Sequence, residues 1–289
     1  MHALVVSVGE TEVELASDAL WSLGVVAIEE RPAADHVELW TSVGDEVDVI
    51  TAVLSQRLAS WRWRFVEVDE TVADTWRGHV GPVWVDIDLV IAPAWVRFVA
   101  DAGVTTLTIE PGSTFGLGDH PTTILSMRAV RAALVRGAKV LDVGCGSGVL
   151  AVGACVLGAS EATAIDIAPA SVPTTEANAA ANGVADRVHV STTPLALIDG
   201  PFDIVVANIL APVLIDLADH LRRVVAPSGV LIVSGVLADH HLHVEDALRP
   251  LRRTSRATCD GWAALTLARQ EGTSTAAPST RSFHRSSRA

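Results

Sequence analysis

A glycine-rich loop at residues 144–148 is the segment of the sequence best suited to bind a ligand. An apolar stretch that predicts a buried strand, Val140-Leu141-Asp142-Val143, runs directly into glycines at positions 144, 146 and 148. Because glycine has no side chain, the backbone of such a loop can approach a ligand closely. The loop alone is weak evidence, since ordinary strand-to-helix turns and nucleotide sites share the pattern.

The charge beside this loop narrows the choice of ligand. Asp142 lies two residues before Gly144, where its carboxylate would repel the pyrophosphate of a dinucleotide. The spacing G-x-G-x-G also differs from the G-x-G-x-x-G of dinucleotide-binding loops. S-Adenosylmethionine has no phosphate and carries an ammonium and a sulfonium, two cations that an acidic loop favours. The alternative interpretation of Asp142 is a solvated carboxylate at a strand end.

Two further polar residues follow apolar strands and are expected at the same edge of the sheet. Asp166 comes 22 residues after Gly144, where a carboxylate would accept hydrogen bonds from ribose hydroxyls. Asn208 follows the predicted strand 203–207, whose last four residues are apolar. Ligands of open α/β sheets bind at the carboxyl ends of the strands, which favours a site role for both residues. Either residue could instead cap the helix that follows it.

A second glycine-containing loop precedes the first helix of this region. Residues 114–123 are Thr-Phe-Gly-Leu-Gly-Asp-His-Pro-Thr-Thr, with Pro121 at the expected helix start. The free N–H groups of a helix start need partners, and the carboxylate tail of a cofactor is one candidate. Capping by Asp119 or Thr122 is the alternative, and His120 is expected to be structural rather than a catalytic base.

From residue 119 to residue 269 the chain alternates between predicted helices and apolar strands. Apolar strands separated by helices indicate a mostly parallel sheet covered on both faces. We therefore expect a Rossmann-like, doubly wound α/β domain at 119–269. Its expected helices are 121–135, 148–157, 170–182 and 212–225, and its expected strands are 139–143, 161–166, 187–191, 203–207 and 229–234.

Residues 1–70 predict a small α+β domain. Its elements follow in the order β-α-β-β-α-β, which is typical of a ferredoxin-like sandwich and predicts no function by itself. Residues 71–118 predict a connector with short strands, and the Ser-, Thr- and Ala-rich residues 270–289 predict a disordered tail. The expected strands are 3–8, 24–29, 36–42 and 61–68, and the expected helices are 10–23 and 45–58.

Composition and charge limit the classes of partner. The 289 residues are 49% hydrophobic and carry a formal net charge of −13, which predicts a globular chain that repels nucleic acid. A local basic face could still coexist with this acidic total. Three cysteines without paired spacing, no export signal and no apolar run of roughly 20 residues predict a cytoplasmic protein without a membrane span. No coiled-coil heptads occur, and a monomer is expected.

Two other groups of residues suggest ligands, but a simpler interpretation is expected for each. Residues 239–243 contain three histidines and an aspartate, yet they lack the i, i+4 histidine pair of a helical zinc site, so no metal is expected. The eight tryptophans could stack on nucleic acid bases, but those at 61–95 lie among acidic and apolar residues. Packing in the core and between domains is expected for them.

Four motifs, taken in this order, resemble the ribosomal protein L11 methyltransferases, the PrmA family of class I S-adenosylmethionine-dependent methyltransferases. The family carries a Phe-Gly-x-Gly-x-His-Pro-Thr-Thr loop, an Asp-x-Gly-Cys-Gly-Ser-Gly loop, an Asp-Ile-Asp-like strand end and an Asn-Ile-Leu-Ala motif. The corresponding segments are 115–123, 142–148, the strand end at Asp166, and 208–211. The resemblance covers residues 110–240 well and the N-terminal part only in its general organisation.

The resemblance implies an N-methyltransferase whose small N-terminal domain recognises a ribosomal protein. In such an enzyme the Asn208 amide oxygen would orient the amine of the substrate, and no dedicated base is required. Enzymes acting on another protein, an RNA or a small amine remain alternatives, as does a cofactor-binding module without turnover. The expected cofactor-binding residues are Thr123, Asp142, Gly144, Gly146, Gly148, Asp166 and Asn208.

Two positions depart from the family pattern. Leu117 stands where the family usually has threonine, and Asp119 stands where it has threonine or arginine. A lost hydroxyl and an added carboxylate beside the cofactor could change the choice of substrate.

Overall fold

The structure is a computed structural model, and several segments of the chain lie outside the residues it describes. Among these segments are the tail at 270–289, most of the predicted helix 45–58, and residues 24–27 of a predicted strand. The described residues are 2–21, 28–42, 51, 58, 60–67, 80–112, 114 and 116–269.

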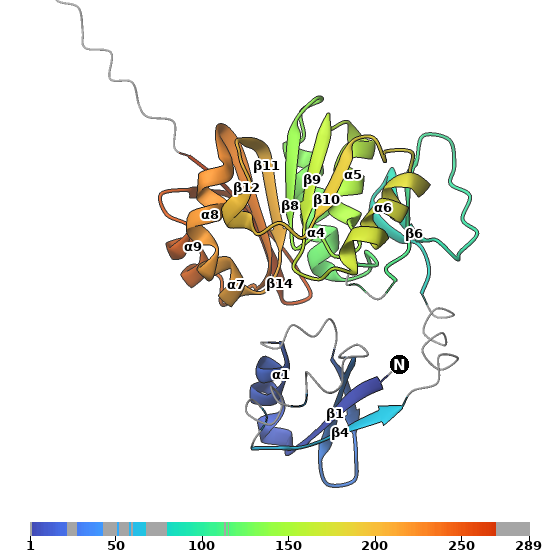
Figure 1. The fold of residues 1–289 in the computed structure, drawn as a ribbon, viewed down its shortest axis with the longest axis vertical. Coiled ribbons are helices and arrows are strands. Elements are labelled where there is room, and N and C mark those ends of the chain that lie inside the picture. The colour runs from blue at the N-terminus through green and yellow to red at the C-terminus, as the bar shows by residue number, and fades with distance from the viewer. Residues whose placement is uncertain are drawn as a thin grey trace, which may run out of the picture.

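The larger part of the chain is built on a seven-stranded sheet in the order β10-β9-β8-β11-β12-β14-β13 (Figure 1). The first five strands in this order pair in parallel, which confirms the predicted doubly wound architecture. An antiparallel pair, β14 and β13, completes the sheet and was not predicted. The strands are β8 (Lys139–Val143), β9 (Glu161–Ile165), β10 (Val188–Ser191), β11 (Phe202–Asn208), β12 (Val225–Leu237), β13 (Arg252–Cys259) and β14 (Trp262–Ala268).

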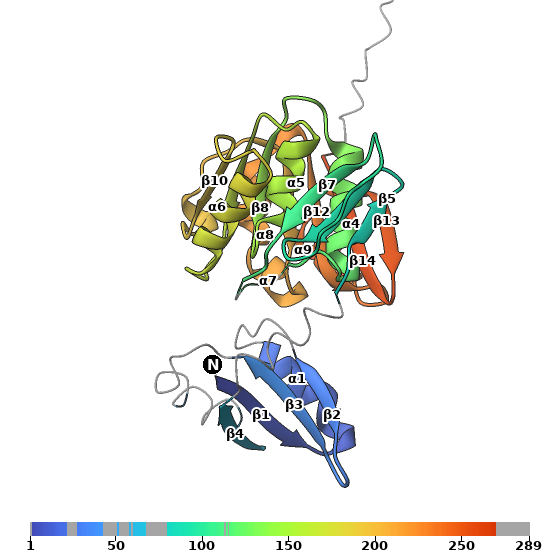
Figure 2. The same cartoon turned by 90° about the vertical axis from the view of Figure 1, so that its right-hand side faces the viewer.

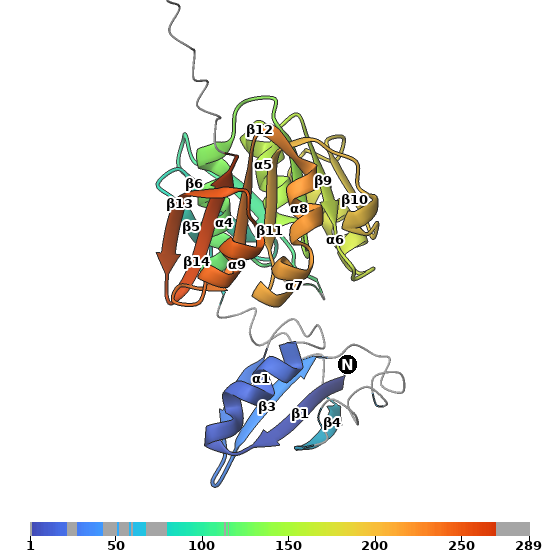
Figure 3. The same cartoon turned by 90° about the vertical axis from the view of Figure 1, so that its left-hand side faces the viewer.

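Helices cover both faces of this sheet, as Figures 2 and 3 show from opposite sides. Successive strand residues belong to opposite cores: Val140 packs in the core of α4 to α6, and Leu141 packs in the core of α7 to α9. No helix in the described part of the chain is long and apolar enough to cross a membrane. The helices are α4 (Pro121–Ala133), α5 (Val149–Leu157), α6 (Ser171–Ala181), α7 (Ala211–Asp216), α8 (Ala218–Val224) and α9 (Leu242–Ala247).

The prediction of one helix at 212–225 is wrong, because the segment forms two helices, α7 and α8. They meet at Leu217, whose backbone angles (φ −89°, ψ 1°) depart from the α-helix. Leu214, Ala218 and Leu221 are all buried in one core, so the apolar spacing continues across the break. This continuity explains why the sequence pattern resembles a single helix. Strand β12 also starts earlier and ends later than the predicted 229–234.

A smaller sheet of three strands packs against α4 and α5. It has the order β5-β6-β7, with β5 at Val83–Asp86, β6 at Leu89–Pro93 and β7 at Thr105–Ile109. Its side chains Leu89 and Leu107 are fully buried in the same core as α4 and α5. The short strands predicted in the connector therefore share a core with the large sheet.

Asn178 of α6 and Asn182, the C-cap residue of that helix, link the smaller sheet to the larger one. Asn182 Oδ1 accepts from the Thr108 backbone N–H at 2.9 Å, and Asn182 Nδ2 donates to the Thr108 carbonyl at 2.7 Å. Asn178 makes the same pair of bonds to Glu110, at 2.9 and 2.8 Å. The two amides lie one helical turn apart and so satisfy the backbone as a neighbouring strand would.

The N-terminal part forms a four-stranded antiparallel sheet in the order β2-β3-β1-β4, which fits the predicted ferredoxin-like domain. Leu4 and Leu39 from the sheet pack with Ala16 and Leu20 from the helix in a separate core. Strand β2 continues three residues beyond the predicted end at 29. The elements are β1 (His2–Val8), the 3₁₀ helix η1 (Glu10–Glu12), α1 (Val13–Trp21), β2 (Glu29–Pro32), β3 (Val37–Ser42) and β4 (Arg62–Glu67).

Candidate functional site

The carboxyl ends of β8, β9 and β11 bring three predicted site residues to one edge of the sheet. Position 143 of β8 is in register with position 165 of β9 and with position 207 of β11. Because the strands are parallel, the residues that follow this row start at the same edge. They are Gly144, Asp166 and Asn208.

The glycine loop has a backbone that only glycine adopts easily. Gly144, Gly146 and Gly148 have φ angles of 74°, 54° and 77°, in the left-handed region that penalises side chains. A Cβ on Gly144 would also lie 2.3 Å from Ile209 Cγ2, and one on Gly148 would lie 2.5 Å from Thr175 Cγ2. The loop therefore needs glycine both for its conformation and for its close packing.

Asp166 links the glycine loop to the segment before α6. Its Oδ2 accepts from the Gly146 N–H and its Oδ1 accepts from the Ala168 N–H, both at 2.8 Å. The alternative role as a helix cap is wrong, since α6 begins at Ser171 and Ala170 is its N-cap. The carboxylate is half-buried, so it keeps acceptor capacity for a bound molecule.

Asp142 is buried beneath the loop, with 1% of its surface exposed. The interpretation as a solvated strand end is therefore wrong. Its Oδ2 accepts from the Ala151 N–H at 3.1 Å, while its Oδ1 has no partner among the described residues. Burial raises the pKa of Asp142 to about 7, the charge of Asp166 acts in the same direction, and the Ala151 hydrogen bond opposes both.

The N-terminus of helix α4 is capped by His120, which was not expected to be the cap. His120 is the N-cap of α4, and its Nδ1 accepts from the Thr122 N–H at 3.3 Å and pairs with Thr122 Oγ1 at 2.7 Å. Asp119 and Thr122, the caps of the alternative interpretation, do not take this position. Burial lowers the pKa of His120, with Asp119 opposing in part, which keeps the ring neutral and able to accept. The His120 ring meets Trp262 edge-on, with centroids 5.2 Å apart.

Thr123, the next residue along α4, is 1% exposed. Its backbone N–H donates to the His120 carbonyl at 3.0 Å, and its Oγ1 has no hydrogen-bond partner in the described part of the chain. A buried polar atom left unpaired costs about 1–3 kcal/mol, so a ligand that satisfies it would be stabilised.

The two loops are held against each other by side chains that the sequence analysis did not identify. Ser147 Oγ donates to the Gly116 carbonyl at 2.5 Å, and Asn178 Nδ2 donates to the Ser147 carbonyl at 2.8 Å. Of the two departures from the family pattern, Leu117 is half-buried and Asp119 is exposed. Asn178 lies 31 residues from Ser147, so only the folded chain reveals their contact.

The hydrogen-bonding groups of Asp142, Thr123 and Asp166 match those that S-adenosylmethionine offers. The unpaired carboxylate oxygen of Asp142 suits a cation, and the unpaired hydroxyl of Thr123 can donate to a carboxylate. Asp166 keeps acceptor capacity for hydroxyl groups, and the glycine loop admits a ligand close to its backbone. S-Adenosylmethionine carries groups of each of these kinds.

In the histidine-containing segment 239–243, the buried histidine, His241, has a structural role. His241 is 6% exposed; its Nδ1 lies 2.6 Å from the Ala238 carbonyl oxygen and its Nε2 lies 3.1 Å from an Arg253 guanidinium nitrogen. Among the described residues, no group of three His, Cys, Asp or Glu side chains is arranged to hold a metal ion.

Comparison with known proteins identifies a family that matches most of the chain. The family model described as "Ribosomal protein L11 methyltransferase (PrmA)" matches residues 3–270. A relative of that name from Methylococcus capsulatus is 36% identical over 258 residues, which cover 82% of this chain and 87% of the relative. Another from Geobacter sp. (strain M21) is 44% identical over 182 residues, which cover 61% of this chain and 60% of the relative. The chain thus spans less than two thirds of the latter's length.

A solved structure shows the same fold. The crystal structure of a ribosomal protein L11 methylase from Lactobacillus delbrueckii subsp. bulgaricus matches with a TM-score of 0.63 and 33% sequence identity. The match covers 66% of this chain and 100% of that chain.

Proposed function

Because the chain belongs to the ribosomal protein L11 methyltransferase (PrmA) family, we propose that it is an S-adenosylmethionine-dependent N-methyltransferase of ribosomal protein L11. Lysine side chains, the N-terminal amine, or both are the proposed acceptors. The observation that carries this proposal is the row of Gly144, Asp166 and Asn208 at one sheet edge, above the buried carboxylate of Asp142. We further propose that it acts as a monomer in the cytoplasm.

Each residue of the cofactor site has a proposed contact. Asp142 would attract the cationic groups, Asp166 would accept from ribose hydroxyls, and the Thr123 hydroxyl would donate to the carboxylate. Gly144, Gly146 and Gly148 keep the loop free of side chains where the cofactor lies. When bound, the cofactor would supply a methyl group on its sulfonium; the amine nitrogen would bond to the methyl carbon as the carbon–sulfur bond breaks, and the nitrogen would release a proton to solvent.

Asn208 has the proposed role of orienting the acceptor amine. It is half-buried at the end of β11. The residue before it, Ala207, is in register with Val143, the residue before Gly144. Its amide oxygen can accept a hydrogen bond from the amine and so aim the nitrogen lone pair. A lysine with a reference pKa of about 10.4 is rarely neutral near pH 7, but a desolvated site lowers that pKa. Orientation and desolvation together need no dedicated base.

Charge supports a basic protein as substrate. The chain carries a formal net charge of −13, which favours encounter with a lysine-bearing protein surface. The small N-terminal domain is the proposed recognition element, as in the family. The half-buried Leu117 and exposed Asp119 are the positions where the choice of substrate would differ from that of other members.

The substitution Asn208→Ala tests the role of that residue. We expect methyl transfer to slow on the order of a hundredfold, because a misplaced nucleophile loses alignment, while calorimetric binding of S-adenosylmethionine stays within a few-fold. Full turnover with intact cofactor binding would show that Asn208 does not orient the amine.

Purified L11, total RNA and a cell extract, each incubated with radiolabelled cofactor, separate the rival functions. Label on L11 supports the proposal, and label on RNA or on another protein points to a different substrate. Cofactor binding without label on any of the three identifies a binding module without turnover.

A further inference from the structure

The charge of this acidic chain is unevenly distributed along the sequence. Residues 249–269 contain five of the 21 Lys and Arg residues and one of the 34 Asp and Glu residues. This segment therefore carries a formal charge of +4, against −17 for the rest of the chain. The segment is thus basic even though the total charge of the chain is −13.

The basic segment folds into the edge of the large sheet. β13 is the last strand in the sheet order, and it pairs with β14 only, as far as the described residues go. Residues 252–258 are all exposed. Three arginines of β13, Arg252, Arg253 and Arg256, are thus displayed on an open strand.

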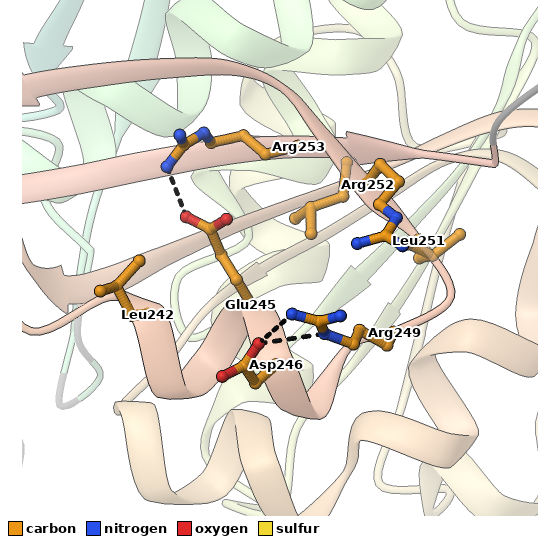
Figure 4. Close-up of a pocket in the computed structure, with 8 residues that line it drawn as sticks. Leu242, Glu245, Asp246, Arg249, Leu251, Arg252 and Arg253 are labelled. Atoms are coloured by element: carbon orange, nitrogen blue, oxygen red, sulfur yellow. Dashed lines mark hydrogen bonds and ion pairs between the residues drawn. The ribbon is translucent and has the colours of Figure 1, made fainter.

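A pocket of about 200 Å³ lies between α9 and β13, away from the glycine loop. Figure 4 shows Arg249, Arg252 and Arg253 around it. Two of these guanidinium groups are held by carboxylates of α9: Arg253 by Glu245 at 2.5 Å and Arg249 by Asp246 at 2.7 Å. These ion pairs fix the orientation of two arginines at the pocket.

Arg252 and Arg256 have no carboxylate partner among the described residues, in contrast to Arg249 and Arg253. Within the described part of the chain, Arg256 donates to His241 Nε2 at 3.4 Å, and Arg269, just after β14, is exposed and donates to the Arg222 carbonyl. Three exposed guanidinium groups are therefore left to interact with an anion. A guanidinium has five N–H donors in a planar fork that matches a phosphate.

We propose that the surface formed by Arg249, Arg252, Arg253, Arg256 and Arg269, here called the arginine edge, binds the phosphate backbone of RNA. The choice of RNA rests on the proposed function. A basic ribosomal protein would be repelled by this surface and attracted to the acidic remainder, so the arginine edge is unsuited to the substrate itself. The polyanion that accompanies a ribosomal protein is RNA, and RNA phosphates complement this surface.

Charged residues on an edge strand also have a simpler use, which is to prevent strands of different molecules from pairing. If that were their sole role, replacing Arg252 and Arg256 would promote aggregation and leave RNA affinity unchanged. The two explanations therefore predict different results for the same variant.

The test is anisotropy of a short fluorescein-labelled, mixed-sequence single-stranded RNA titrated with the full chain at several salt concentrations. The test variant is R252Q/R256Q. The control is R62Q/R97Q, which removes the same charge from two exposed arginines outside the arginine edge. A second control, R281Q/R285Q/R288Q, removes the arginines of the C-terminal residues.

We expect R252Q/R256Q to weaken RNA binding on the order of tenfold or more at low salt. The slope of log K against log salt should fall by about 1.4, since each lost phosphate contact on a single strand contributes about 0.7. Both control variants should bind RNA with nearly the same affinity as the wild-type chain, and with nearly the same slope of log K against log salt.

The proposal is overturned if the original chain does not bind the RNA at low salt, or if R252Q/R256Q binds it as tightly as R62Q/R97Q. Loss of binding only in R281Q/R285Q/R288Q would also overturn it, as would a polyglutamate peptide that binds more tightly than the RNA. Because RNA binding is measured without methyl transfer, its failure is distinguishable from failure of the proposed methyltransferase function.

Discussion

The two functional surfaces proposed here lie on one sheet, yet they are built in opposite ways. Near the carboxyl end of β8, one oxygen of the buried Asp142 carboxylate is unpaired among the described residues, as is the buried Thr123 hydroxyl in the first turn of α4. On β13 and just before it, the charged groups are exposed, and ion pairs hold Arg249 and Arg253 at a pocket. Burial suits the first surface to the proposed small-molecule cofactor, whereas exposure suits the second to the proposed polyanion.

The largest effect is expected from Gly144→Ala, which tests whether the first surface depends on close packing. The added Cβ would lie 2.3 Å from Ile209 Cγ2 at a φ of 74°. We expect calorimetry to show that S-adenosylmethionine affinity falls by more than roughly a hundredfold. RNA affinity should not change.

Gly137→Ala is the matched control for that change. Gly137 also has a positive φ, 88°, but a Cβ there would meet nothing within 4 Å. The substitution Gly137→Ala should lower the stability of the fold by about 1–2 kcal/mol through backbone strain and leave cofactor affinity intact. Equal losses of cofactor affinity in both variants would show that strain, rather than packing at the site, determines the effect.

An intermediate effect is expected from Asp166→Asn. An amide has one acceptor oxygen, so either the Gly146 N–H or the Ala168 N–H would face an NH₂ group instead of a carboxylate oxygen. Cofactor affinity should fall roughly tenfold to a hundredfold. Asp186→Asn, at an exposed position, is the control; a similar loss in that variant would contradict a specific role for Asp166.

The smallest effect is a pH dependence that comes from Asp142, whose pKa burial raises to about 7. Protonation below this value removes the negative charge that attracts the cofactor. Affinity should therefore rise on the order of tenfold as the pH increases toward about 7 and level off above it. Calorimetry across this range should show the rise in the original chain and its absence in Asp142→Asn.

The same shift predicts the sign of a stability change in the free protein. Between the ordinary range of an aspartate and about pH 7, the folded chain binds more protons at Asp142 than the unfolded chain does. Stability should thus decrease as the pH rises through this range. Thermal unfolding of Asp142→Asn should lack that decrease, and an identical pH profile in both proteins would contradict the assigned pKa.

The positions of the residues proposed for the first surface could be predicted from the sequence because the signals are local. The glycine loop, Asp166 and Asn208 each follow an apolar strand, and parallel strands bring such positions to one edge. It did not predict His120 as the cap of α4, because that depends on a side-chain rotamer rather than on the usual preference for Asp or Thr.

The second surface could not be predicted from sequence in the same way. β13 pairs antiparallel with β14, and its exposed residues lack the apolar alternation that marks a half-buried strand. The positions of Arg249 and Arg253 depend on ion pairs with α9, a helix of six residues that the pattern did not reveal. The total charge of −13 concealed the local excess of arginine.

Methyl transfer itself gives the most direct test of the central claim. Purified chain, radiolabelled S-adenosylmethionine and purified ribosomal protein L11 are incubated together, with Asp166→Ala as the control for cofactor binding. We predict label on L11 with the original chain, and loss of both label and calorimetric cofactor binding with the variant. Absence of S-adenosylmethionine binding by the original chain would contradict the methyltransferase assignment, and binding without label on L11 would contradict the proposed substrate.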